Sequence, residues 1–179
     1  MPIIRGRSVR VLFSAEAIAR RNAELAAEIA AAGYRDLLIL SVLKGSFVFA
    51  ADLVRALHDA GLSPEVDFMT LSSYGESTVS SGKVSLLKDI ESALAGRDVL
   101  IVDDILETGR TLAFARDYLV SRGAARVGLA VMLDKSGKRK TAIDADHVGF
   151  ICPDYFVVGY GMDAAHAFRE LPYVGVVED

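Results

Sequence analysis

The chain has 179 residues, of which 52% are hydrophobic, and its 20 basic and 24 acidic side chains give a net charge of −4. This length favours one domain, residues 1–179, with a substantial core, and the acidic balance argues against a general nucleic-acid-binding surface. The single cysteine, Cys152, excludes an internal disulfide and fits a reducing compartment, where we expect it to be buried and structural. No apolar run is long enough to span a membrane and no secretory signal is apparent, so we expect a cytoplasmic protein.

The elements expected first along the chain are a helix and a buried strand. Ser14 is a good N-cap and Gly33 a good helix stop, which predicts a helix over 14–32 with a narrow apolar stripe. A near-continuous apolar run predicts a strand over 37–43 that is covered on both faces. Patterning then predicts helices over 47–60 and 111–122, a polar loop over 72–83, and strands over 66–71, 84–87, 99–102, 127–133, 147–151 and 156–158.

Strands that alternate with helices predict an α/β fold, a mostly parallel sheet flanked by helices on both faces. In such sheets ligands bind beyond the carboxyl ends of the strands. Lys44, Asp103 and Lys135 each follow an apolar strand. We therefore expect these side chains to gather along one edge of the sheet.

The most informative stretch is residues 99–112, Val-Leu-Ile-Val-Asp-Asp-Ile-Leu-Glu-Thr-Gly-Arg-Thr-Leu. A buried strand, a pair of acids and a glycine turn at a helix N-terminus suit a phosphorylated sugar. The N–H groups of the turn receive the phosphate, and the acids face the sugar hydroxyls and Mg²⁺. Adjacent positions in an extended segment predict that Asp103 and Asp104 point to opposite sides and share no proton. Taken alone, the stretch also fits an ordinary strand, loop and helix with an acidic cap.

This stretch resembles the signature of the type I phosphoribosyltransferases, which bind phosphoribosyl pyrophosphate (PRPP), and the resemblance runs over about 11–177. It implies the type I fold, with a core at about 36–150 and a small base-binding hood from about 1–13 and 151–179. It implies a pyrophosphate loop with a cis peptide between Leu43 and Lys44, and a lid over 72–83. The residues assigned to the ribose and 5′-phosphate are Asp103, Asp104, Glu107, Thr108, Gly109, Arg110 and Thr111; those assigned to pyrophosphate are Lys44, Gly45 and Arg169; and Ser73 and Tyr74 begin the lid.

The resemblance also implies a purine site. Lys135 matches the donor to the 6-oxo group, and its ammonium, which has no acceptor, would oppose the 6-amino group of adenine. Phe156 matches the residue that stacks on the base, the backbone at Val157 reads the base edge, and Asp163 belongs to the same segment. Asp163, Asp103 and Asp104 are the carboxylates associated with Mg²⁺.

Each of these positions has a plainer interpretation from the sequence alone. Lys44 fits a turn lysine, Lys135 a surface lysine and Phe156 a core aromatic. The loop over 72–83 fits a mobile hairpin, Arg169 fits a helix-surface arginine, and Arg110 fits a solvent-exposed side chain as well as a phosphate ligand.

The chain departs from the family at its acids. Purine enzymes of the family usually read Glu-Asp-x-x-Asp, whereas this chain reads Asp103-Asp104-x-x-Glu107. The third acid is the one assigned to purine N7, as general base or hydrogen-bond partner, and it is the catalytic residue implied here. Misplacing such a group by about 1 Å can cost on the order of 100-fold in rate. We expect Glu107 to serve through a folded rotamer or a small shift of the loop.

The resemblance implies an enzyme that converts hypoxanthine or guanine and PRPP to IMP or GMP and pyrophosphate with Mg²⁺. It also implies a homodimer or homotetramer, and the acidic balance and the lack of a membrane-length apolar run lead us to expect no nucleic-acid or membrane partner. Two alternatives are a uracil-responsive, RNA-binding regulator of a pyrimidine operon with the same fold, and a PRPP-binding relic without activity. The acid at 107, the Leu-Lys-Gly-Ser loop and the Lys135/Phe156 pair favour the purine enzyme over the regulator.

Overall fold

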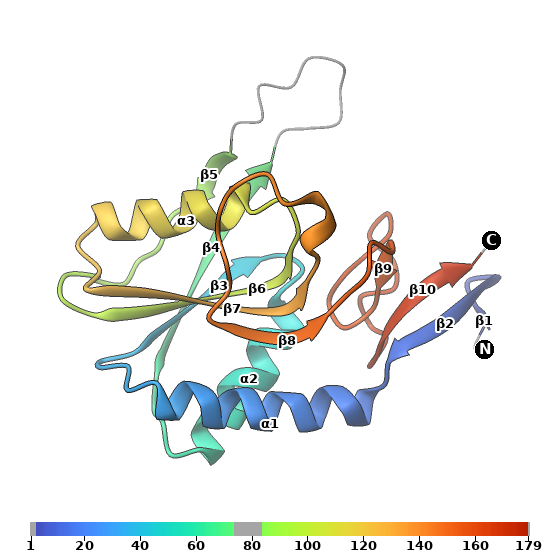
Figure 1. The fold of residues 1–179 in the computed structure, drawn as a ribbon, viewed down its shortest axis with the longest axis horizontal. Coiled ribbons are helices and arrows are strands. Elements are labelled where there is room, and N and C mark those ends of the chain that lie inside the picture. Colours follow the sequence, from blue (N-terminus) through green and yellow to red (C-terminus); the bar gives the residue numbers. More distant parts are fainter. Residues whose placement is uncertain (1–2, 74–83, 179) are drawn as a thin grey trace.

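The computed structural model describes residues 3–73 and 84–178, and folds them into two sheets and three α-helices (Figure 1). The expected lid falls mostly on 74–83, so Tyr74 lies outside the described residues. The elements in chain order are β1 (Ile3–Ile4), β2 (Arg7–Phe13), α1 (Ala15–Ala31), β3 (Leu38–Leu43), α2 (Phe47–Asp59), β4 (Glu65–Ser73), β5 (Val84–Lys88), β6 (Asp98–Leu106), α3 (Arg110–Ser121), β7 (Arg126–Asp134), the 3₁₀ turn η1 (Ser136–Lys138), β8 (His147–Ile151), β9 (Val157–Val158) and β10 (Val174–Glu178).

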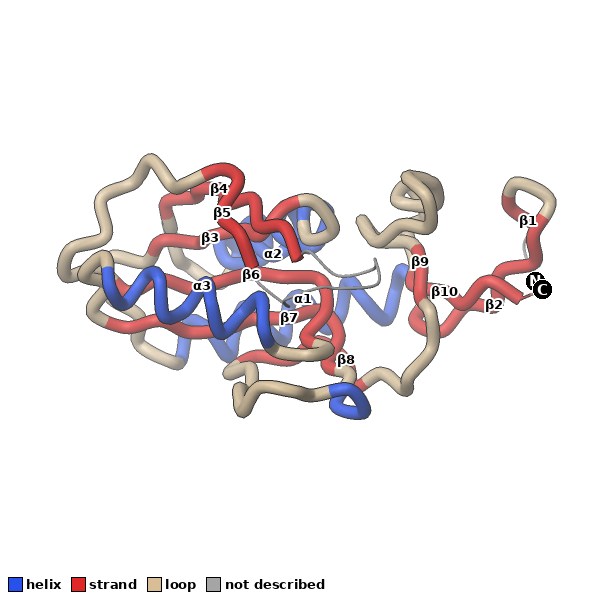
Figure 2. The backbone as a smooth tube through the Cα atoms, turned by 90° about the horizontal axis from the view of Figure 1, so that it is seen from above, coloured by secondary structure: helices blue, strands red, loops and turns tan. Residues whose placement is uncertain are grey.

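The larger sheet has the order β5-β4-β3-β6-β7-β8. All its neighbouring strands pair in parallel except β5, which is antiparallel to β4. Helices α1 and α2 lie on one face and α3 on the other (Figures 1 and 2). The expected fold, a mostly parallel sheet with helices on both faces, is confirmed.

Local sequence explains the first helix. The Ser14 hydroxyl accepts the N–H of Ala17 at 3.2 Å, as an N-cap should. The expected apolar stripe is buried, with Ile18, Leu25 and Ile29 in the core between α1, α2 and the sheet. A second core fills the space between α3 and the opposite face.

Strand β6 is longer than its apolar run predicts. It continues through the acids to Leu106, because β7 pairs with it at Asp103, Ile105 and Leu106. Asp103 and Asp104 therefore lie on the last residues of a strand, and Glu107 follows directly after it. A rigid strand holds them at the carboxyl edge of the sheet.

The smaller sheet has the order β1-β2-β10-β9, with antiparallel pairing throughout. It joins the two ends of the described chain at one side of the larger sheet (Figure 1). A small core of Val9, Val158, Ala167, Phe168 and Leu171 supports it. The strands at 7–13 and 174–178 do not stand out in the sequence, because neither has a long apolar run and both are only partly buried.

Two expectations from composition can be checked here. Cys152 is buried, as expected of a structural thiol, and burial raises its pKa. None of the described helices is both long enough and apolar enough to cross a membrane.

Candidate active site

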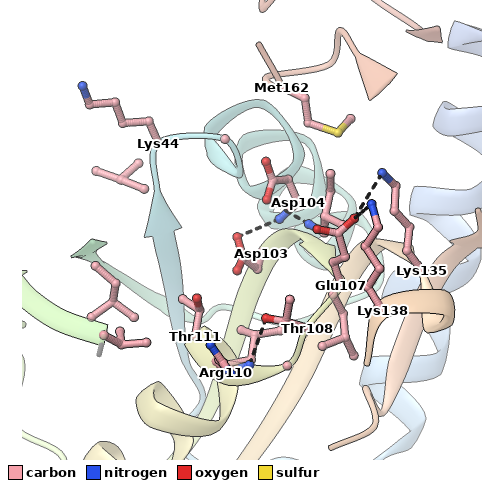
Figure 3. Close-up of a pocket in the computed structure, with 18 of the residues that line it drawn as sticks. Lys44, Asp103, Asp104, Glu107, Thr108, Arg110, Thr111, Lys135, Lys138 and Met162 are labelled. Carbon is pink, nitrogen blue, oxygen red and sulfur yellow. Dashed lines mark hydrogen bonds and ion pairs between the residues drawn. The ribbon is translucent and has the colours of Figure 1, made fainter. Parts of the chain in front are cut away.

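A pocket of about 960 Å³ opens at the carboxyl edge of the larger sheet, where the strand ends, the loops after them and the 156–169 segment meet (Figure 3). Apart from Ser73, which ends β4, and Tyr74, every residue predicted for the site lines it. These residues are Lys44, Gly45, Asp103, Asp104, Glu107, Thr108, Gly109, Arg110, Thr111, Lys135, Phe156, Val157, Asp163 and Arg169.

The two adjacent acids interact. Asp103 accepts the N–H of Asp104 at 2.9 Å, and Asp104 accepts the N–H of Ile105 at 2.8 Å, so both carboxyls bend along the strand. Burial raises the pKa of Asp103 well above its usual range, and the charge of Asp104 and a hydrogen bond between the two side chains raise it further. The prediction that these two carboxyl groups share no proton stays a prediction. Strand alternation describes where Cβ atoms point, not where a carboxyl bends to find a donor.

Two glycines close the pocket around Asp104. A Cβ on Gly45 would lie 1.8 Å from Oδ2 of Asp104, and a Cβ on Gly161 would lie 2.2 Å from the carbonyl oxygen of Gly45. The absence of a side chain at Gly45 lets the 43–46 loop pack against Asp104, and its absence at Gly161 lets the 159–163 turn pack against that loop. The expected cis peptide between Leu43 and Lys44 is present. The Lys44 side chain is exposed and extends away from Asp104 (Figure 3).

Arg169 is held on the same side of the pocket. Its guanidinium donates to the carbonyl of Gly161 at 2.6 Å and pairs with Asp163 at 2.8 Å. Asp163 also accepts the N–H of His166 at 2.7 Å. Burial raises the pKa of Asp104, and the charge of Arg169 opposes that rise. Arg169 lies in a turn rather than on a helix surface, so the plainer interpretation is wrong.

The loop between β6 and α3 forms a turn suited to an anion. Gly109 adopts a φ of +80° and immediately precedes the first helical residue, Arg110. The first N–H groups of a helix have no partner within it, and the helix dipole makes that end positive. The Arg110 side chain is exposed, and its backbone N–H donates to the Thr108 hydroxyl at 3.4 Å.

At the other end of the pocket a lysine and an acid approach each other. Lys135 is only 6% exposed, which excludes the surface-lysine interpretation, and its ammonium donates to the carbonyl of Tyr155 at 2.5 Å. The same ammonium lies 3.9 Å from Oε1 of Glu107. Figure 3 shows the Glu107 side chain extended toward Lys135.

Phe156 and Val157, which follow Tyr155 in the chain, differ in burial. Phe156 is 67% exposed and lines the pocket, so the core interpretation is wrong. Val157 is buried and pairs with Val176 in the smaller sheet. An apolar ring is thus exposed beside a buried ammonium and a carboxylate, which suits a flat, polar-edged ligand.

Lys138 is a pocket residue that the sequence prediction missed. It lies on η1, 3.8 Å from Oε1 of Glu107 and 2.9 Å from Oδ1 of Asp154. The hydrogen bond to Asp154, then the charges of Asp154 and Glu107, raise its pKa. The Lys135-Ser-Gly-Lys138 spacing was the available signal, because one 3₁₀ turn places residues i and i+3 on the same side.

The described part of the chain gathers no group of three or more His, Cys, Asp or Glu side chains that would hold a metal by itself. The paired Asp103 and Asp104 are nevertheless a suitable donor set. Burial raises both pKa values, so a cation placed there would favour their ionised forms. A hard cation such as Mg²⁺ usually takes only one or two carboxylates and completes its shell with water and substrate oxygens.

Comparison with known proteins identifies relatives of the whole described fold. The phosphoribosyl transferase domain family matches residues 8–165. The hypoxanthine-guanine phosphoribosyltransferase of Bacillus subtilis is 46% identical over 171 residues, which cover 94% of this chain and 93% of that protein. The bifunctional protein TilS/HprT of Listeria innocua is 45% identical over 170 residues, 94% of this chain but only 26% of that longer protein. A crystal structure of a hypoxanthine phosphoribosyltransferase from Staphylococcus aureus has a TM-score of 0.87 at 39% identity, and the match covers 94% of this chain and 91% of that one.

Proposed function

The chain belongs to the phosphoribosyl transferase family, and we propose that it joins hypoxanthine or guanine to PRPP, giving IMP or GMP and pyrophosphate. The observation that carries the choice of base is the Lys135–Glu107 pair beside Phe156. A 6-oxopurine presents O6 and N7 side by side on one edge. An ammonium and a carboxylate 3.9 Å apart can contact both atoms at once.

The pair explains selection against adenine. Lys135 is a donor without acceptor capacity, and its burial leaves it little access to water. It can donate to O6, whereas the 6-amino group of adenine would leave the ammonium facing another donor. A site built around one polar partner can reject its opposite by orders of magnitude.

Glu107 would handle the proton of the base. In the tautomer that carries hydrogen on N7, N9 has a free electron pair to attack C1′ of the ribose. The C1′–O bond to pyrophosphate breaks with its electron pair going to pyrophosphate, and the N7 proton passes to the Glu107 carboxylate. A positioned general base of this kind contributes typically 10²–10⁴-fold.

The rest of the pocket would orient PRPP. The turn over 107–111 would offer N–H and hydroxyl donors to the 5′-phosphate, and Arg169, Lys44 and the backbone at Gly45, which line the same pocket, would bind the departing pyrophosphate. Asp103 and Asp104 would repel phosphate oxygens but can accept hydrogen bonds from ribose hydroxyls. This ordering of anion-binding and hydroxyl-binding groups gives PRPP one orientation.

Mg²⁺ fits the acids of this site. Asp103, Asp104 and Asp163 are the carboxylates that would reach it, directly or through water. When bound, Mg²⁺ would neutralise charge on the departing pyrophosphate. The protein side chains then hold the reactants, because binding geometry and placed charges supply most of the catalysis in such transfers.

The wider setting of the enzyme is part of the same proposal. One domain would have its core at about 36–150, and the described parts of the terminal segments would form the hood that holds the base. The protein would act in the cytoplasm as a homodimer or homotetramer. Phe47, 45% exposed at the start of α2, supports an apolar contact between subunits.

The test is nucleotide formation from PRPP and Mg²⁺ with hypoxanthine, guanine, xanthine, adenine and uracil measured side by side. Turnover of hypoxanthine or guanine, with none of adenine or uracil, is expected. Turnover of uracil alone would contradict the proposal and favour the regulator. Measurable PRPP binding without turnover of any base would favour a relic.

A further inference from the structure

Three successive carbonyl groups, at the end of β6 and in the turn that follows it, face one neighbouring segment. The carbonyl of Leu106 accepts the N–H of Lys135 at 2.9 Å. The carbonyl of Thr108 accepts the N–H groups of Lys140 at 2.9 Å and Thr141 at 3.1 Å. We call residues 135–141, which supply these donors, the brace segment.

The carbonyl between these two, that of Glu107, is bonded by a side chain. Nε of Arg139 donates to it at 3.1 Å. The same guanidinium donates to the carbonyl of Ile143 and pairs with the carboxylate of Asp134. The Arg139 side chain is only 17% exposed, and each of its nitrogens has a named partner.

Turning these carbonyls toward the brace segment has a geometric consequence. In a planar trans peptide the N–H points opposite to the C=O of the same unit. With the carbonyls of Leu106, Glu107 and Thr108 directed to the brace, the N–H groups of the following residues are directed away from it. Successive N–H groups that converge in this way form an anion-binding concavity.

Gly109 shows how closely the two segments pack. A Cβ at this position would lie 2.6 Å from Cγ2 of Ile143, 3.0 Å from the carbonyl oxygen of Thr141 and 3.3 Å from Cδ of Arg139. Only a glycine at this position leaves room for Ile143, Thr141 and Arg139.

We propose that Arg139 is a positioning residue for PRPP: it fixes the turn over 106–109 from behind, so that the backbone N–H groups are preorganised for the 5′-phosphate. This inference rests on the proposed function and extends it to a residue that does not line the pocket. Among the hydrogen bonds that the described residues of the brace segment donate to the turn, only that of Arg139 comes from a side chain. Substitution can therefore remove that bond while the backbone bonds remain.

The experiment compares Arg139→Met and Arg139→Lys with Arg126→Met in the full chain. Arg126 is a matched control, because its guanidinium also donates to a backbone carbonyl, that of Ala32 at 3.0 Å, but far from the pocket. The readouts are KM for PRPP, KM for the purine base, the Kd of ribose 5-phosphate by calorimetry, and the thermal midpoint. Ribose 5-phosphate probes the turn without the base or pyrophosphate.

Arg139→Met is expected to raise KM for PRPP and the Kd of ribose 5-phosphate about tenfold, the usual scale for losing a hydrogen bond to a charged group. KM for the base should change by much less, and Arg139→Lys should recover part of the loss. Arg126→Met should lower the thermal midpoint without changing KM for PRPP. Equal effects on PRPP and base, or unchanged ribose 5-phosphate binding in Arg139→Met, would overturn the inference.

The outcome also separates this inference from the proposed function. A wild-type protein that binds ribose 5-phosphate but turns over no base would contradict the proposed reaction, and the calorimetric comparison would still decide the role of Arg139. A wild-type protein that binds no ribose 5-phosphate would overturn both.

Discussion

Oε1 of Glu107 lies 3.9 Å from the buried ammonium of Lys135 and 3.8 Å from that of Lys138. Two cations on the segment after β7 thus draw the carboxylate toward the end of the pocket where Phe156 is exposed. Glu107 is one methylene longer than the aspartate usual in the family, and the extra length is taken up in reaching these lysines. The side chain extends toward these lysines, and its part in catalysis stays a prediction.

Glu107→Gln should lower kcat about 100-fold or more, because an amide cannot take the N7 proton. Glu107→Asp keeps the negative charge but moves the carboxylate away from Lys135 and Lys138. The kcat of Glu107→Asp should therefore exceed that of Glu107→Gln and be no higher than that of the wild type. Steady-state rates with hypoxanthine at saturating PRPP measure both effects.

Thermal midpoints close to that of the wild type would show that the Glu107 variants are folded. A Glu107→Gln enzyme as fast as the wild type would remove Glu107 from the chemistry. The base site would then rest on Lys135 and Phe156 alone.

Lys135→Gln should weaken selection between 6-oxo and 6-amino purines. Its amide can donate to O6 or accept from an amino group, whereas the ammonium can only donate. We expect kcat/KM for hypoxanthine to fall about 10- to 100-fold, the scale of losing a charged donor, and the ratio of hypoxanthine to adenine turnover to narrow. Parallel assays with the two bases measure both quantities.

Lys44→Gln is a suitable comparison, since Lys44 also lines the pocket but is exposed and extends away from the acids. Lys44→Gln should raise KM for PRPP and leave the ratio of hypoxanthine to adenine turnover unchanged. If Lys135→Gln keeps the wild-type ratio of hypoxanthine to adenine turnover, Lys135 does not read the 6-position.

How far the sequence predicts this molecule depends on the range of the interactions involved. Apolar runs and helix caps located β3, β6, β7 and α1 within a few residues, because these signals are local. The strands β2 and β10 were missed, because their pairing joins residues such as Val9 and Val177, and neither strand has a long apolar run.

The site was predicted where motifs carry it and missed where tertiary contacts create it. Lys44, Asp103 and Lys135 each follow an apolar run, and the carboxyl ends of such strands must meet, so their gathering could be predicted. The contact of Lys138 with Glu107 and Asp154 depends on where η1 packs, and the bend of Asp103 toward Asp104 depends on local N–H donors. Neither is visible in a residue pattern.

Gly45→Ala should disable the pocket. The new Cβ would lie 1.8 Å from Oδ2 of Asp104, so the acid or the loop must move. A displacement of about 1 Å at reacting groups can cost on the order of 100-fold, and we expect a loss of kcat/KM for PRPP on that scale. Gly61→Ala is the control, because a Cβ there meets nothing within 4 Å.

Gly61 has a φ of +88°, so its alanine variant should lose stability through backbone strain without losing activity. Activity and urea unfolding measured on both variants separate the two effects. A fully active Gly45→Ala enzyme would show that Asp104 can leave its position against the loop without consequence.

Asp67, which does not line the pocket, makes the stability of the protein depend on pH. Burial would raise its pKa, but the N–H groups of Ser92, Phe68 and Glu91 donate to its carboxylate at 2.7 to 2.9 Å and lower the pKa overall. A folded-state pKa below the unfolded one stabilises the protein above the unfolded value near 3.9, and this stabilisation is lost as pH falls through the folded value. Asp67→Asn should therefore lower the free energy of unfolding by about 1–3 kcal/mol at pH 7, with the gap from wild type shrinking below about pH 4. Urea unfolding at pH 7, 5 and 3.5 measures the free energy of unfolding of both proteins, and Asp117→Asn, at an exposed position, is the control. A difference between Asp67→Asn and the wild type that stays constant over this range would show that the charge of the Asp67 carboxylate does not stabilise its contacts with Glu91 and Ser92.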